Sequence, residues 1–320
     1  MQKWEHLKLA SKEWSGIVDT QPYSYKMIQS DEFYKFCWAK IKKFSNVDVV
    51  LDTIKSIGLD GQVVCEKNIF NGNKVFNSAL FHIPKNNKRH HLLQHFKGWY
   101  VNFEYPVLDP KTATLMDFDI EQRGDCRFIY LLPLSKTKAL VEYTVFSKTL
   151  LPEDKYDDAL LKYLNDKFPN QKYNIENIEF GVIPMTNATI NSAHNGSTVI
   201  SIGTAGYASK ASTGYTFGFI QRQCKQIIKY LENEHKSPLV LKPSAKFQFY
   251  DAVLLNVIAT GKYEGWKIFT RLFKRLPAPL VLRFLNEETE FLQDLRIISS
   301  VNIWQFTKAA VQELKAGLKK

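Results

Sequence analysis

Four segments rich in β-branched and aromatic residues dominate the chain between residues 94 and 185: GWYVNFEY, RFIYLLPL, ALVEYTVFS and NIEFGVIPM. Such residues favour strands, and short strands joined by brief turns are typical of an antiparallel sheet. One segment among them, PEDKYDDALLKYLNDKF, has apolar residues at helical spacing instead. The middle of the chain is therefore predicted to be an antiparallel sheet with one inserted helix.

The sequence before this sheet indicates a helical part followed by strands. Apolar residues in SDEFYKFCWAKIKKF recur at helical spacing, so the first 45 residues are predicted to be helical, with Ser30 and Asp31 as the N-cap. Residues 47–81 are strand-like. NIFNGNKVF predicts a hairpin with Asn71 and Gly72 at its turn, because residues tolerant of positive φ are needed there.

After residue 198 the pattern changes to a strand, a loop and a helix. The strand is TVISIG, the loop is rich in small residues, and the helix keeps apolar side chains three and four residues apart at Phe217, Ile220, Cys224, Ile227 and Leu231.

The chain from Pro238 onward is predicted to be helical, with a break at Pro277 and Pro279. Its segment GWKIFTRLFKRLPAPLVLRFL interleaves apolar and basic residues, which is the pattern of a basic amphipathic helix. Two interpretations fit equally well: a helix that packs on the core with a solvated basic face, or one that lies on a membrane surface.

Composition narrows the choice of partners. A chain of 320 residues with 45% hydrophobic residues can bury a large core and suggests two packed units. Its 43 basic and 32 acidic residues give a net charge of +11, which suits nucleic acid or an anionic membrane. No recognisable nucleic-acid-binding module is present, so we expect no nucleic-acid partner.

Neither a metal site nor a membrane-spanning helix is predicted. The cysteines Cys37, Cys65, Cys126 and Cys224 form no C-x-x-C pair, which argues against zinc and disulfides and favours a reducing compartment. His90 and His91 are expected in a solvated basic turn. The longest uncharged stretch, 181–209, contains a proline and many Asn, Ser, Thr and Gly residues and cannot span a bilayer.

The small-residue loop has the chemistry of an anion or cofactor cradle. Backbone amides at a helix N-terminus carry unsatisfied donors, and Gly203, Ala205, Gly206 and Gly214 would let a phosphate or a flavin edge approach closely. A tight structural turn is an equally good interpretation of the loop alone.

Six motifs together resemble the lycopene cyclase family in order and spacing. They are Q-x-F-x-G-W at 94–99, L-M-D-F at 115–118, Y-x-L-P-L at 130–134, V-E-Y-T-x-F-S at 141–147, I-P-M at 183–185 and S-T-G-Y at 212–215. Further segments on both sides extend the resemblance over nearly the whole chain.

The resemblance implies an α/β (α+β) flavoprotein of the hydroxylase type. It assigns 1–93 and 196–236 to a Rossmann-like FAD-binding domain, 94–195 to an antiparallel-sheet substrate domain, and 237–320 to a helical C-terminal portion. The sequence contains no G-x-G-x-x-G. We therefore expect a truncated FAD-binding domain that lacks the family's N-terminal Gly-rich segment for the ADP part of FAD.

The resemblance also implies an activity. Lycopene cyclases close the ends of lycopene or a related linear carotene into rings without net redox change, and they need FAD in its reduced form. A β-cyclase acting at both ends is the default expectation. Because the substrate is apolar, we expect a cytoplasmic protein that associates peripherally with a membrane surface.

Glu142 stands at the family's essential glutamate and is the expected acid. On a strand it shares a face with Leu140, Thr144 and Phe146, and an apolar face would raise its pKa. The expected cofactor-binding residues are Gly203, Thr204, Ala205, Gly206, Thr213 and Gly214.

Asp117 has two interpretations, a second catalytic carboxylate or a turn cap. The aromatic residues Trp99, Tyr105, Tyr130 and Tyr143 either line a polyene tunnel or belong to an ordinary core. The sequence departs from the family pattern at Asp119, Tyr207 and Ala211, where Arg, Gly and Pro are common.

Two alternatives remain. One is a flavin-dependent isoprenoid reductase or hydroxylase of the same fold, which would consume NAD(P)H or oxygen. The other is a non-catalytic relative that binds carotenoid or membrane without flavin.

Overall fold

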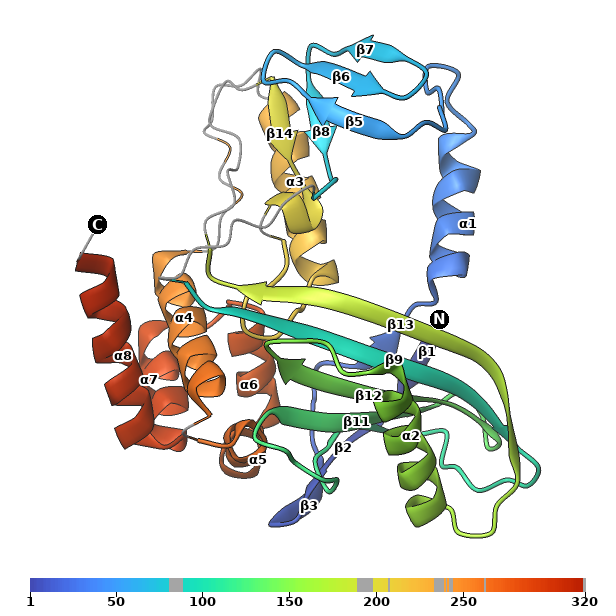
Figure 1. Cartoon of the computed structure of the whole chain (residues 1–320), viewed down its shortest axis with the longest axis vertical. Coiled ribbons are helices and arrows are strands. Elements are labelled where there is room, and N and C mark those ends of the chain that lie inside the picture. The colour runs from blue at the N-terminus through green and yellow to red at the C-terminus, as the bar shows by residue number, and fades with distance from the viewer. Residues whose placement is uncertain are drawn as a thin grey trace.

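The computed structural model describes residues 1–80, 89–188, 198–206, 208–232, 239, 241, 244–261 and 263–318. Its largest element is one sheet, whose strands are β2 (His6–Ser11), β3 (Trp14–Val18), β9 (His91–Phe103), β10 (Thr112–Asp117), β11 (Cys126–Pro133), β12 (Lys138–Ser147) and β13 (Tyr173–Thr186). The seven strands lie in the order β13-β9-β12-β11-β10-β2-β3 (Figure 1). Neighbours are antiparallel except β10 and β2, which run parallel. The predicted antiparallel sheet is thus confirmed for 91–186.

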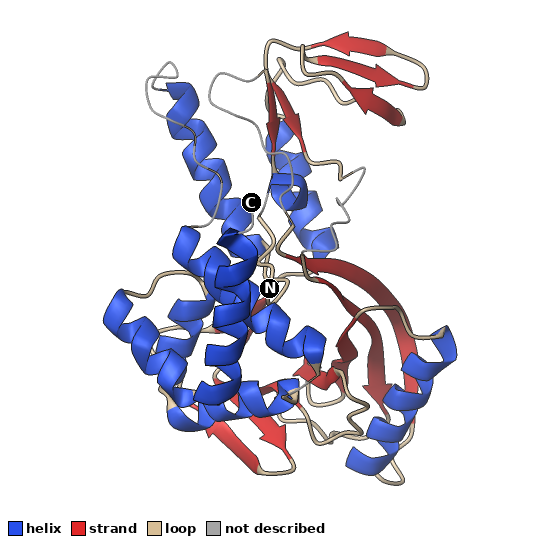
Figure 2. Ribbon diagram, turned by 60° about the vertical axis from the view of Figure 1, so that its left-hand side comes forward, coloured by secondary structure: helices blue, strands red, loops and turns tan. Residues whose placement is uncertain are grey.

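Side chains alternate between two faces of this sheet, and each face has its own core. On β12, Leu140 and Phe146 join a core with the C-terminal helices, whereas Val141 and Val145 join a core beneath the helix α2 (Glu153–Lys167). The predicted inserted helix is α2. Figure 2 shows the sheet with helices on both sides.

The C-terminal portion is helical, as predicted. Its helices are α4 (Ala245–Thr260), α5 (Gly265–Arg275), α6 (Ala278–Leu285), α7 (Phe291–Ser300) and α8 (Ile303–Leu318). The break falls between α5 and α6, where Pro277 is the N-cap residue of α6.

The basic amphipathic helix α5 packs on the core. Trp266, Phe269 and Leu272 are buried in the core of the C-terminal helices, and Lys274 and Arg275 are exposed. Of the two interpretations, the core-facing one is confirmed, so the apolar face of α5 is not available to a membrane. Within the part of the chain that the structure describes, no helix is both long and apolar enough to cross a bilayer.

A second group of elements lies beyond the β13 side of the sheet (Figure 1). The strand β14 (Val199–Ser201) pairs in parallel with β8 (Val75–Asn77), and β14 leads through the 3-10 helix η1 (Gly203–Gly206) to the helix α3 (Phe217–Glu232). A three-stranded sheet of β5 (Ile54–Ile57), β6 (Gln62–Cys65) and β7 (Ile69–Asn71) and the helix α1 (Ser30–Ile41) complete it. The predicted strand, loop and helix order after residue 198 is confirmed.

The N-terminal expectations were wrong in two places. Residues before Ser30 are not helical: they form β1 (Gln2–Trp4), β2, β3 and β4 (Tyr25–Met27), and the N-cap of α1 is Gln29. The buried residues Leu7 and Leu9 follow the period of two that a strand requires. Although 1–93 was assigned to the FAD-binding part, β2 and β3 belong to the large sheet.

The second error is the hairpin at Asn71 and Gly72. The strand β7 pairs with β6, whereas β8 pairs with β14, so the two arms of the expected hairpin lie in different sheets. Long-range parallel pairing with β14 replaces the local pairing that the turn residues indicated.

Candidate active site

A row of residues crosses the large sheet at the level of Glu142. Backbone register pairs Glu142 of β12 with Tyr130 of β11 on one side and with Gly98 of β9 on the other. Gly98 is paired in turn with Glu179 of β13. Directly paired residues project from the same face. Leu140 belongs to the core of the C-terminal helices, so this row lies on their face of the sheet.

Gly98 leaves the space between the two glutamates free of a side chain. The strands β12 and β13 are separated by β9, a distance of about 10 Å between backbones. A Cβ atom built on Gly98 would lie 2.9 Å from Cγ of Glu179 and 2.9 Å from Cδ1 of Leu140. The side chain of Glu179 therefore lies over Gly98, which allows the carboxyl groups of Glu142 on β12 and Glu179 on β13 to meet.

The carboxyl of Glu142 is an acid that keeps its proton near neutrality. Burial is the largest cause that raises the pKa of Glu142 to about 8, and the charge of Glu179 and a hydrogen bond shared with it act in the same direction. A hydrogen bond from the Thr144 hydroxyl, 2.9 Å from Oε1, opposes them. On the far side, the Tyr100 hydroxyl donates to Oε2 of Glu179 at 3.3 Å.

Three tyrosines form a group beside Glu142. Tyr25 on β4 and Tyr130 on β11 interact with its carboxyl, and Tyr215, after the small-residue loop, interacts with both of these tyrosines. Burial raises the pKa of Tyr215 to about 12 and raises the pKa values of Tyr25 and Tyr130 well above the usual range. All three are consequently neutral phenols. Each of the three residues is half-buried.

The loop after β14 is held by Gln223 of α3. The Gln223 Oε1 accepts from the backbone N–H of Gly203 at 2.8 Å, and its Nε2 donates to the carbonyl oxygen of Gly206 at 2.7 Å. A side chain on Gly206 would collide with the carbonyl oxygen of Ser201. Gly203 has a φ of 59°, and among the described residues other than its chain neighbours no atom lies within 4 Å of the position its Cβ would take. The loop thus presents bare backbone to open space at Gly203.

Hydroxyl groups connect the two halves of the loop. Thr204 Oγ1 and Ser209 Oγ are 3.1 Å apart, and Ser209 Oγ and Thr216 Oγ1 are 2.9 Å apart. The Thr216 hydroxyl in turn donates to the carbonyl oxygen of Gly214 at 2.8 Å. The two predicted cofactor-binding segments, 203–206 and 213–214, are therefore parts of one unit.

A buried lysine fastens this unit to the C-terminal helices. The Lys210 side chain is 2% exposed, and its Nζ lies 2.8 Å from Asp251 Oδ1 and 3.0 Å from Glu287 Oε1. The Ser212 hydroxyl donates to the same Oδ1 of Asp251 at 2.6 Å. Burial raises the pKa of Glu287, although Lys210 counteracts it.

The loop meets the large sheet on the face that carries Glu142. A side chain on Gly214, whose φ is 70°, would collide with Oε1 of Gln94 on β9. Gln94 and Gly98 are four residues apart on one strand and so project from the same face. The Gln94 Oε1 is buried and finds no hydrogen-bond donor among the described residues. It is an unused acceptor between the loop and the sheet.

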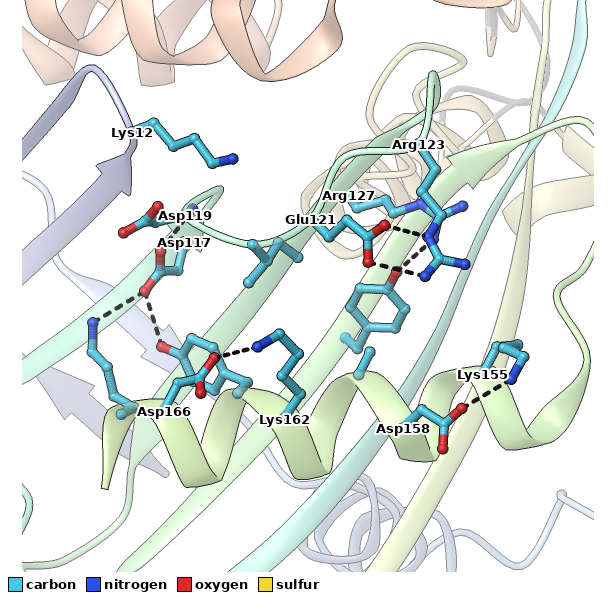
Figure 3. Close-up of a pocket in the computed structure, with 15 residues that line it drawn as sticks. Lys12, Asp117, Asp119, Glu121, Arg123, Arg127, Lys155, Asp158, Lys162 and Asp166 are labelled. Atoms are coloured by element: carbon cyan, nitrogen blue, oxygen red, sulfur yellow. Dashed lines mark hydrogen bonds and ion pairs between the residues drawn. The ribbon is translucent and has the colours of Figure 1, made fainter. Parts of the chain in front are cut away.

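Asp117 lies on the opposite face, beneath α2. Its carboxylate accepts from the Tyr163 hydroxyl at 3.0 Å, from Lys167 Nζ at 3.4 Å and from the backbone N–H of Asp119 at 3.1 Å (Figure 3). The structure therefore does not bring Asp117 to Glu142, and the bond to Asp119 is that of a turn cap.

The cleft beside Asp117 has a volume of about 710 Å³, yet it does not contain the acid. Its wall is charged with both signs, and most of these charges are paired, as in Lys162 with Asp166 and Arg123 with Glu121 (Figure 3). A lining of ion pairs does not suit a hydrocarbon substrate.

The four aromatic residues that were expected to line a tunnel lie in three different parts of the structure. Trp99 and Tyr143 lie in the core beneath α2, and Tyr105 is exposed; Tyr130 alone of the four stands beside Glu142. Ala211 packs against the core of the C-terminal helices, and Tyr207 lies outside the described residues.

Sequence reasoning missed Glu179, Gly98, Tyr25 and Lys210 as members of the site. Gly98 is the glycine of the Q-x-F-x-G-W motif, and that was the available signal for it. Glu179 and Tyr25 reach Glu142 only through strand pairing and long-range packing.

Solved structures share the fold of this chain at low sequence identity. The chain is similar to a geranylgeranyl bacteriochlorophyll reductase-like protein (Ta0516) from Thermoplasma acidophilum, at 11% identity and a TM-score of 0.62, over 97% of this chain and 83% of that one. It is also similar to the flavin-dependent brominase Bmp2, at 11% identity and a TM-score of 0.50, over 99% and 82%. The chain therefore has the mixed α/β fold that these two structures share.

Within this fold class the sequence identifies the family. The family model described as lycopene cyclase protein matches residues 1–313. The chain belongs to the lycopene cyclase family. No curated protein matches it.

Proposed function

We propose that this protein is an FAD-dependent lycopene β-cyclase, which closes the ends of lycopene into rings by acid catalysis without net redox change. The observation that carries the proposal is the Glu142 carboxyl. It has a pKa of about 8 and lies on the sheet face that also receives the small-residue loop. A neutral acid among aromatic rings is what protonation of an alkene requires.

Reduced FAD is the proposed cofactor. Gly203, Thr204, Ala205, Gly206, Thr213 and Gly214 would hold it. Two observations support the fit: the open side of Gly203, and the buried acceptor Oε1 of Gln94 against Gly214. When bound, reduced FAD supplies an electron-rich ring system that stabilises a nearby cation electrostatically.

The protein's own residues carry the proton and shield the cation. Glu142 donates its proton to the terminal alkene of the substrate. The faces of Tyr25, Tyr130 and Tyr215 stabilise the resulting cation through their π electrons. The apolar core of the C-terminal helices keeps water from capturing the cation before the ring closes.

The cofactor assignment predicts that Gly203→Val weakens FAD binding by about tenfold or more, because the side chain occupies the open space and strains a residue at positive φ. Titration of flavin fluorescence measures the affinity. Gly124→Val is the matched control: Gly124 also has positive φ and open space around it, but it lies in the turn before β11. Equal FAD affinity of the Gly203 variant and the wild type would contradict the assignment.

Anaerobic incubation with lycopene in liposomes and reduced FAD tests the activity. We expect a product with rings and the same mass as lycopene, separated by chromatography and identified by mass spectrometry. Mass gain, or turnover that depends on NAD(P)H or oxygen, would contradict a cyclase.

Reduction of an isoprenoid is the second candidate, favoured by the similarity to the reductase-like protein at a TM-score of 0.62. The same incubation with NAD(P)H distinguishes it, since a reductase adds hydrogen to the substrate. Flavin titration without any binding would instead favour a non-catalytic carotenoid- or membrane-binding relative.

We also propose a cytoplasmic location with peripheral membrane association, because lycopene is delivered from a bilayer. The net charge of +11 supports contact with anionic lipids. Flotation with anionic liposomes tests this, and recovery of all protein in the soluble fraction would remove the idea.

A further inference from the structure

We propose that Glu179 is a positioning and proton-sharing residue of this site, which acts through Glu142 across Gly98. The inference rests on the proposed cyclase function. It adds a second carboxyl, which keeps Glu142 protonated between turnovers.

The first support is the geometry of the pair. Glu179 belongs to the edge strand β13 and Glu142 to β12, and the strand between them contributes a glycine at the point where they meet. Oε1 of Glu179 would lie 3.1 Å from a Cβ on Gly98. Any other residue at 98 would separate the two carboxyls, so their approach depends on this one backbone position.

The second support is the position of Glu179 at the edge of the sheet. Glu179 is half-buried on an edge strand, and its Oε2 accepts a hydrogen bond from Tyr100. Burial raises the pKa of Tyr100 to about 12, with a smaller contribution from Glu179, so the phenol stays protonated and can donate to Glu179. Both glutamates are half-buried, but Glu179 lies on the edge strand and Glu142 on an inner one, so Glu179 can pass a proton inward from the edge of the sheet.

Ring closure requires that a proton enters and another leaves. Glu142 gives its proton to a terminal alkene carbon, and the alkene electrons form the new C–H bond. The cation on the adjacent carbon accepts electrons from a second alkene, which makes the ring C–C bond. A ring C–H bond then breaks, its electrons form the ring double bond, and its proton goes to the Glu142–Glu179 pair. The pair ends with the proton it had at the start.

The surrounding groups leave Glu179 as the carboxyl whose replacement changes the surroundings of Glu142. Within the described part of the chain, the titratable side chains that interact with Glu142 are Glu179, Tyr100, Tyr130 and Tyr25. The three phenols remain neutral across the assay range because their pKa values are raised. A change in the ionisation of Glu142 on mutation of Glu179 therefore reports on the carboxyl pair.

The test is the pH profile of cyclisation by Glu179→Gln. Removal of the second carboxylate lowers the pKa of Glu142, so the fall in activity at high pH begins at a lower pH than in the wild type. If the pKa of Glu142 falls by one unit, the ratio of the variant's rate to the wild-type rate drops about fivefold between pH 6 and pH 8. Glu176→Gln is the matched control on the same strand, because Glu176 pairs with Lys138 at the surface.

An unchanged profile in a folded Glu179→Gln protein would overturn the proposal. A second measurement needs no activity: the carboxyl of Glu142 is titrated by NMR with ¹³C-labelled glutamate in the wild type and in both variants. A lower Glu142 pKa in Glu179→Gln alone supports the pair even if lycopene is not the substrate, and an unmoved one refutes it. Failure of the wild-type chain to cyclise lycopene would instead count against the proposed function.

Discussion

Glu142→Gln is expected to reduce ring closure by about a thousandfold, the scale of a lost general acid. The amide keeps the volume of the carboxyl and can still accept the hydrogen bond from Thr144, so the packing around it is preserved. What it lacks is a proton acidic enough to transfer to an alkene. Product formation per enzyme, measured at saturating reduced FAD, gives the rate.

Stability provides the control for this variant. The pKa of Glu142 is about 8 in the fold against a usual value of 4.5, so the unfolded chain ionises first as pH rises. The stabilising contribution of the neutral acid is present below pH 4.5 and is lost progressively up to about pH 8. Glu142→Gln avoids this loss. Above pH 8 its free energy of unfolding should therefore exceed that of the wild type, by at most about 5 kcal/mol. An inactive variant that is also less stable at high pH would point to misfolding rather than to lost chemistry.

Lys210→Met should lower the free energy of unfolding by roughly 3–5 kcal/mol. The substitution leaves Asp251 and Glu287 buried without their shared cation, and uncompensated buried charge is among the most costly defects. Chemical denaturation near pH 7 measures the loss. Because the pKa of Glu287 is raised, its protonation in mild acid should reduce the difference between variant and wild type.

The matched control is Lys155→Met on α2. Lys155 also contacts two carboxylates, Asp154 and Asp158, but all three side chains are exposed and screened by water. We expect little change in stability there. A Lys210 variant as stable as the Lys155 variant would mean that the ion triad does not hold the loop.

The sheet and the face on which Glu142 lies could be predicted because their signals are local. Alternation along β12 placed Glu142 with Leu140 and Phe146, and the structure confirms this face. The glycines after β14 likewise marked a tight loop before a helix, as observed. In these cases the period and the residue types determine the local structure without reference to distant segments.

The features that the sequence predicted wrongly or missed depend on pairing between distant segments. Turn residues at Asn71 and Gly72 favour a hairpin, but β8 pairs instead with β14, over a hundred residues away. The partner of Glu142 was missed for the same reason. Glu179 reaches it only because a register shift between Ile175 and Asn177 sets which residue of β13 faces Gly98. The local sequence does not predict such a register.

The parallel pairing of β2 with β10 has a consequence for how the chain folds. The strand β2 precedes the other strands of the sheet in the sequence, but it has no neighbour on its inner edge until β10 has been made, and β9, β11 and β12 must also align before the sheet is complete. Such non-local closure is intrinsically slow and leaves edges unprotected in the meantime. Deletion of β2 and β3 would leave β10 as an open edge, a template for intermolecular pairing and aggregation.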